Sequence, residues 1–136
     1  MTIGGSMLKN LLIIGTGGFI GAVSRYIAFL AFDRFYHKTG FPIGTLAVNL
    51  IGSLIIGITF GLSVKFNIFS RHAVSHMLFV TGFLGSFTTF STFSQDNLIL
   101  LLDKNYGLFA LNICTSVIAG ILLAAAGYFA VTAAVQ

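Results

Sequence analysis

Apolar residues fill this chain in four long runs that are separated by short polar segments. The runs cover about residues 11–32, 43–64, 73–102 and 106–131. Each run is long enough to cross the hydrocarbon of a bilayer, which takes about 20 residues of α-helix. The pattern predicts an all-α integral membrane protein, in which residues 1–136 form a single domain of four transmembrane helices.

The third run is too long for one continuous span. Thirty residues of α-helix rise about 45 Å, whereas bilayer hydrocarbon is about 30 Å thick. Gly82 and Gly85 tolerate unusual dihedrals, and the hydroxyl residues that follow can satisfy freed backbone groups. We therefore expect a break over residues 82–88, in the middle of the membrane. Irregular backbone at that depth must be buried in protein or line a polar cavity, so the break predicts an ion or solute site.

Composition supports the membrane assignment. Of the 136 residues 57% are hydrophobic and 7% are charged, whereas a soluble domain carries roughly 25% charged residues. The acidic residues are Asp33, Asp96 and Asp103. The net charge of +4 comes from basic residues scattered singly between apolar runs, which is typical of membrane flanks and not of nucleic-acid binding.

Basic residues are balanced across the expected membrane. The side of the N-terminus holds Lys9, Lys65 and Arg71, and the opposite side, with the expected loop 33–41, holds Arg34, Lys38 and Lys104. Such a balance gives almost no preference under the positive-inside rule. We therefore expect the chain to insert in both orientations.

Small and polar residues recur every fourth position in three of the spans. Gly17 and Gly21 give the first span a face for close helix contact. The second span carries Thr45, Asn49, Ser53, Gly57 and Gly61, and the last carries Asn112, Ser116, Gly120 and Ala124. Asn49 is either an interhelical clamp or an amide donor that faces a permeation path. Arg25, about two-thirds along the first span, either snorkels to the boundary or lies near a ligand.

The segment after the expected break has two chemically different faces. In a helix, Phe90, Phe93 and Ser94 share one face, and Thr88, Ser91 and Thr92 share the other. Aromatic ring edges are electropositive and hydroxyls donate hydrogen bonds, so both faces suit an anion without a fixed charge that would hold it too tightly for conduction. Carbonyls exposed at the break suit a small cation. Packing of the rings and hydrogen bonds between helices are the alternatives.

Over nearly its whole length the chain resembles the Fluc/CrcB family of small fluoride channels. The segments that carry the resemblance are Gly17–Tyr26, Gly44–Ser53 and Gly82–Ser94. The resemblance implies an antiparallel, dual-topology homodimer in the inner (plasma) membrane, with two fluoride pores and a structural sodium ion at the dimer centre.

The resemblance also implies roles for individual residues. The carbonyls of Gly85 and Thr88 would hold the sodium ion, and Arg25 would lie near a vestibule. The pore residues would be Asn49, Phe90, Phe93, Ser91, Thr92, Ser94 and Ser116. A Glu often follows the third motif in such proteins, but Gln95 and Asp96 stand here, so no acidic role is assigned.

The leading hypothesis is a passive, fluoride-selective channel that exports fluoride from the cytoplasm, with membrane lipid and a second copy as its partners. A four-span, proton-coupled multidrug exporter is the alternative. Such coupling needs a carboxylate deep in a span, and Asp96 is the one candidate in a chain without Glu. A non-conducting scaffold subunit would leave the break unexplained. An enzyme is not expected, because the histidines lie in or next to loops without catalytic spacing.

Overall fold

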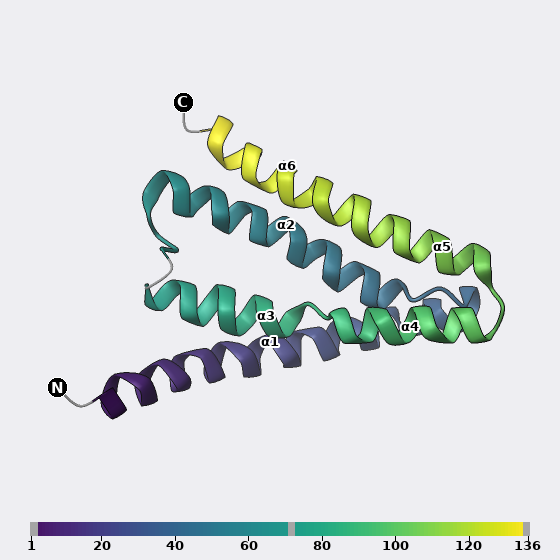
Figure 1. The fold of residues 1–136 in the computed structure, drawn as a ribbon, viewed down its shortest axis with the longest axis horizontal. Coiled ribbons are helices and arrows are strands. Elements are labelled where there is room, and N and C mark those ends of the chain that lie inside the picture. The colour runs from purple at the N-terminus through teal and green to yellow at the C-terminus, as the bar shows by residue number, and fades with distance from the viewer. Residues whose placement is uncertain (1–2, 71–72, 135–136) are drawn as a thin grey trace.

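The computed structural model describes residues 3–70 and 73–134, which form helices joined by short turns (Figure 1). In order the elements are α1 (Ile3–Thr39), α2 (Ile43–Phe66), η1 (His76–Leu84), α3 (Gly85–Phe87), α4 (Phe90–Leu102), α5 (Tyr106–Cys114), η2 (Thr115–Ala119) and α6 (Gly120–Ala133), with η1 and η2 π-helical. Four segments are long and apolar enough to cross a membrane: Gly5–Phe32, Ile43–Phe66, His76–Leu102 and Tyr106–Ala133. The all-α class with four candidate spans is confirmed.

The first helix is longer than expected at both ends. α1 begins at Ile3 and continues to Thr39, so the prediction of a loop over 33–41 was wrong for most of that range. No glycine or proline lies between Gly21 and Gly40, and polar residues alone do not end a helix. Gly40, with φ +66°, and Pro42 separate α1 from α2.

The second helix also extends past its expected end. α2 continues to Phe66, and Asn67 ends it in the left-handed conformation with φ 55°. Lys65 is therefore helical, although it follows the end of the predicted run at residue 64. Arg71, which was placed on the same side of the membrane, lies outside the described residues.

The third span is interrupted at Thr88 and Thr89, at the C-terminal edge of the expected window and one residue past it. Both residues are extended, with ψ 158° at Thr88 and φ −150° at Thr89. Gly82 and Gly85 stay helical, so the assignment of the break to these glycines was wrong. Gly82 serves packing instead, because a Cβ there would come within 2.6 Å of the Ile14 carbonyl oxygen.

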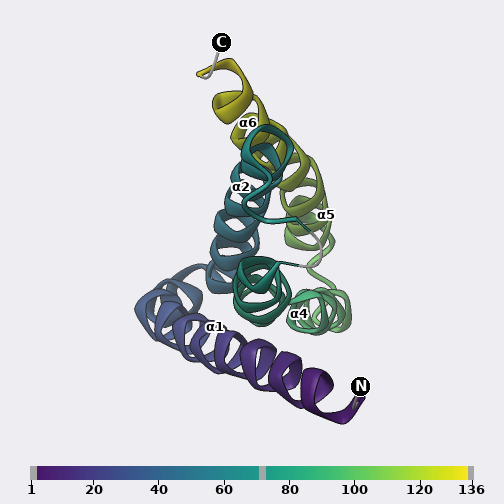
Figure 2. The same cartoon turned by 90° about the vertical axis from the view of Figure 1, so that its left-hand side faces the viewer.

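Close backbone contacts join the helices in two pairs, α1 with η1 and α2 with α6 (Figure 2). A Cβ on Gly17 would overlap the Leu78 carbonyl, and one on Gly21 would overlap the Phe83 carbonyl. Gly57 meets the Ala124 carbonyl in the same way. The small-residue face of the first span therefore packs on η1, and that of the second span packs on α6.

The ends of the described chain and two of its turns lie at opposite ends of the molecule. The N- and C-terminal ends of the described chain lie toward one end, and the turns at Gly40–Pro42 and Asp103–Asn105 lie at the other (Figure 1). α4 and α5 form a hairpin around the second turn, and the helices diverge away from it (Figure 1). The hairpin is therefore V-shaped, with its apex at Asp103–Asn105.

Replacement of Gly17 by alanine should destabilise the fold, because the new methyl group must push α1 away from η1. We expect the free energy of unfolding to fall by about 1–3 kcal/mol, the usual cost of overpacking. Gly15→Ala is the matched control on the same helix, since nothing lies within 4 Å of a Cβ there. Thermal unfolding in detergent measures both variants. Equal melting temperatures for the two would contradict the close contact.

Candidate functional site

One side chain on α2 pairs with both the N–H and the carbonyl of Thr89, the second extended residue of the break. The Thr89 N–H donates to Asn49 Oδ1 at 2.8 Å, and Asn49 Nδ2 donates to the Thr89 carbonyl at 3.1 Å. An extended residue inside a helical span loses its helical partners, and an amide offers both a donor and an acceptor in one plane. The geometry therefore makes Asn49 an interhelical clamp, which was one of its two predicted roles.

The same clamp changes the hydrogen bonding of the preceding turn. In a continuous helix the Thr89 N–H would donate to the carbonyl of Gly85, four residues earlier. It donates to Asn49 instead, and the Thr88 N–H and Thr88 Oγ1 both donate to the Leu84 carbonyl. The Gly85 carbonyl thus loses its usual helical donor.

A cavity of about 410 Å³ lies beside the break, between α2 and the third span. Its lining includes Asn49, Gly85, Thr88, Thr89 and Phe90. Four of these five were predicted site residues, and the fold brings them together from α2 and from both sides of the break. Thr89 was not among the predicted site residues, although it lies in the stretch that was singled out.

Arg25 reaches the break from α1. Its Nη1 lies 3.5 Å from the Thr88 carbonyl oxygen, and the side chain is half-buried. This distance is at the long limit of a hydrogen bond. Arg25 therefore places a positive charge next to the extended backbone, and does not simply snorkel away from it.

The hydroxyls after the break are bonded mainly to each other and to backbone. Thr89 Oγ1 accepts from the Thr92 N–H at 3.2 Å and donates to Thr92 Oγ1 at 3.0 Å, which caps α4. Ser91 Oγ lies 3.3 Å from Thr89 Oγ1, and Ser94 Oγ donates to the Phe90 carbonyl at 3.0 Å. Thr88 precedes the helix, so the predicted helical face that it would share with Ser91 and Thr92 does not form.

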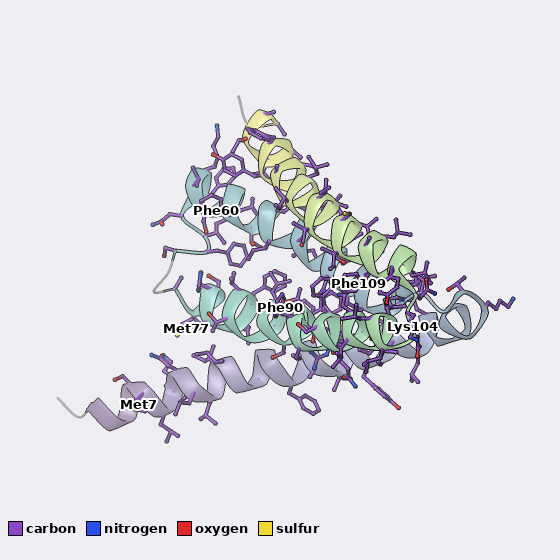
Figure 3. All side chains as sticks on the ribbon, turned by 45° about the vertical axis from the view of Figure 1, so that its right-hand side comes forward. Met7, Phe60, Met77, Phe90, Lys104 and Phe109 are labelled. Carbon is purple, nitrogen blue, oxygen red and sulfur yellow. The ribbon has the colours of Figure 1, made fainter. Side chains whose placement is uncertain are left out.

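Phe90 and Phe93 differ from the aromatic residues before the break. Phe83 and Phe87 stack with ring centroids 5.7 Å apart, and Phe87 is buried. Phe90 is 79% exposed, lies near the middle of the molecule (Figure 3), and has its ring centroid 5.7 Å from that of half-buried Phe93. Within one subunit, packing therefore explains the earlier rings but leaves Phe90 without neighbours that cover it.

Asp96 lies in the middle of α4 and lines a second cavity, of about 230 Å³, with Thr92, Thr45 and Phe29. Its Oδ2 atom is buried and has no hydrogen-bond partner among the described residues. The cavity lies between α1, α2 and α4. Of these helices, α4 also carries Phe90 and Phe93. Asp96 was considered only as the carboxylate that the alternative exporter would need, and no role in a fluoride path was predicted for it.

Ser116 belongs to a third group, on the last span. Its Oγ donates to Asn112 Oδ1 at 3.4 Å, and Asn112 Nδ2 donates to Asn97 Oδ1 at 3.2 Å. Asn112 was noted only as part of a repeating stripe, and Asn97 was missed. A buried amide in an apolar run must find partners, so the isolated Asn97 was the available signal.

Comparisons with known proteins agree on one family. Residues 12–128 match the family described as CrcB-like protein, Camphor Resistance (CrcB). A Fluoride-specific ion channel FluC of Campylobacter jejuni (strain 81-176) is 46% identical over 114 residues, which are 82% of this chain and 88% of the relative. FluC of Campylobacter lari is 40% identical over 90% of this chain and 97% of the relative, and FluC of Bacteroides fragilis (strain YCH46) is 40% identical over 88% and 94%. The relatives are named as channels and not as enzymes.

Removal of the clamp should destabilise the break. Asn49→Leu leaves the Thr89 N–H and carbonyl unpaired, and each unpaired buried group costs about 1–3 kcal/mol of unfolding free energy. Thermal unfolding and hydrogen exchange at the Thr89 amide measure the loss. Ser53→Ala, one turn along the same helix, removes a hydroxyl that donates to the Asn49 carbonyl at 2.7 Å and is the control. A Thr89 amide that exchanges equally slowly in both variants would refute the clamp.

Proposed function

This chain belongs to the CrcB/FluC family, and from that premise we propose that it is a passive fluoride channel that exports fluoride from the cytoplasm across the plasma membrane. The observation that carries the proposal is the interrupted third span, where Asn49 holds Thr89 and where rings and hydroxyls lie together. The family relatives are fluoride-specific channels, which also argues against the multidrug exporter.

The chemistry of the site suits a small, strongly hydrated anion. Fluoride leaves water only where hydrogen-bond donors and electropositive edges replace its hydration. Phe90 offers an exposed ring edge next to the break. Thr92 Oγ1 accepts from Thr89, so the Thr92 proton is not used in that bond. Ser91, Ser94 and Ser116 carry further hydroxyls along α4 and η2. Ser94 Oγ donates to the Phe90 carbonyl and Ser116 Oγ to Asn112 Oδ1, so an anion would compete with these acceptors for the two protons.

We infer that the functional unit is a dimer of oppositely inserted copies with two pores. The basic residues are balanced, and Phe90 is left exposed beside the cavity that Gly85 and Thr88 line. Both described ends of the chain lie toward one end of the molecule. A label near either end therefore reports which way a copy is inserted in the membrane. A reporter fused to the C-terminus should report both orientations in one population, and a single orientation throughout would exclude the arrangement.

A structural sodium ion held by the Gly85 and Thr88 carbonyls is the further proposal for the dimer centre. The donor set fits a hard, monovalent cation, because the oxygens are neutral and the Gly85 carbonyl has lost its helical donor to Asn49. Arg25 contacts the Thr88 carbonyl weakly, so this oxygen would be shared. Dimer stability that does not change when sodium is replaced by a bulky organic cation would refute the assignment.

Purified protein in liposomes should release fluoride and retain chloride, without a pH gradient. Phe90→Ile and Phe93→Ile should abolish most of the flux while the protein still folds, because an aliphatic wall replaces electropositive ring edges. If the rings only pack, the same changes should cost less than about 1.5 kcal/mol of stability and leave flux intact. Phe60→Ile, at an exposed ring on α2 that contacts Tyr128, is the control. Fluoride-electrode recordings measure efflux, and equal fluoride and chloride fluxes in the unmodified protein would overturn the proposed function.

A further inference from the structure

Two buried amides connect the helix that carries the phenylalanines to the helix that carries Ser116. Asn97 is 7% exposed and Asn112 is 1% exposed. Asn97 Nδ2 donates to the Phe93 carbonyl at 2.8 Å, and Asn97 Oδ1 accepts from Asn112 Nδ2 at 3.2 Å. Asn112 Oδ1 in turn accepts from Ser116 Oγ at 3.4 Å. A continuous chain of hydrogen bonds therefore runs from the Phe93 turn to Ser116.

Asn97 lies on the same face of α4 as the two phenylalanines. It follows Phe90 by seven residues and Phe93 by four, which at about 100° per residue places it within about 40° of each. Leu100, one turn further, is also buried, at 6% exposure. The face that presents rings at the start of α4 is thus the face that packs on α5 near the turn.

The amide pair also sets which residues lie level across the hairpin. α4 and α5 run antiparallel from the turn at Asp103–Asn105, so positions four residues beyond the paired amides lie level with each other. These positions are Phe93, before Asn97, and Ser116, after Asn112. Each is about 6 Å further from the turn than its amide.

Within the described chain, the amide pair is the one side-chain hydrogen bond that crosses from α4 to α5, η2 or α6. The helices diverge beyond it (Figure 1). The turn fixes the apex of the V, but a turn alone leaves each helix free to rotate about its own axis. A buried polar pair restricts such rotation, since any other arrangement leaves an amide unpaired.

We propose that Asn97 and Asn112 are positioning residues of the anion path, whose paired amides fix the rotation of α4 against α5 and so keep the Phe93 ring and the Ser116 hydroxyl in one relative placement. Ser116 Oγ donates to Asn112 Oδ1 at 3.4 Å, so the amide pair also orients this hydroxyl. This inference rests on the proposed function.

The test compares Asn97→Leu, Asn112→Leu and the double variant in liposomes and in thermal unfolding. Each single variant leaves one buried amide unpaired and should melt at a lower temperature. The double variant removes both amides and should regain stability, because two apolar side chains can pack where the pair was. Its fluoride flux should nevertheless stay roughly tenfold or more below that of the unmodified protein, the loss expected for one hydrogen bond to a charged group.

Thr59→Val is the matched control, because it removes another buried hydroxyl, 4% exposed, whose bond to the Ile56 carbonyl lies within α2. It should keep the flux of the unmodified protein. A double leucine variant that conducts as fast as this control, with unchanged selectivity against chloride, would show that the amide pair contributes only to packing. That result would overturn the inference. An unmodified protein that does not conduct fluoride would overturn the proposed function itself, and the inference with it.

If the double variant does not fold, Asn97→Asp decides the question. The protonated carboxyl group of this variant can still donate to the Phe93 carbonyl and accept from Asn112, whereas the carboxylate cannot donate. Flux should therefore recover as pH falls, and more steeply than in Gln95→Asp, which places the same charge on the other side of Asp96 at an exposed position. Identical pH profiles for the two aspartate variants would show an effect of charge alone and overturn the inference.

Discussion

The two hydrogen bonds between Asn49 and Thr89 are the constraint on which the rest of the site depends. A helix that opens inside hydrocarbon exposes an N–H and a carbonyl that water cannot reach, and each would cost several kcal/mol if left unpaired. One planar amide satisfies both groups. The interruption can therefore persist, α4 can begin afresh at Phe90 with its own cap, and the carbonyl of Gly85 is left without its helical donor.

A segment rich in hydroxyls offers fewer donors than its composition suggests. Ser94, Thr88 and Ser53 return their protons to backbone carbonyls one turn away. Thr89 divides its hydroxyl between the cap and Thr92. This back-bonding is what Ser and Thr usually do in helices. The donors that can serve an ion are thus set by the fold around each hydroxyl.

The four spans could be predicted from the sequence because continuous apolar runs have few other structures open to them. The break was expected in nearly the right place for the wrong reason, since Gly82 is needed for close packing and the extended residues are threonines. Asn49 stood out as an amide in hydrocarbon, but its partner, forty residues away, could not be read from local pattern. Asn97 could have been noticed as an amide in an apolar run, but its partner Asn112 lies on another span, and spacing within one helix does not indicate that pairing.

Gly17, Gly21 and Gly57 restrict how this sequence can change over time. Every other amino acid carries a Cβ atom, and at these three positions that one atom already overlaps a carbonyl of the neighbouring helix. Intolerance there does not depend on the polarity, charge or size of the replacing residue, so no conservative substitution exists. Phe19, between Gly17 and Gly21 on the same helix, is 73% exposed within one subunit. Neighbouring positions of one helix thus meet very different steric constraints within the subunit.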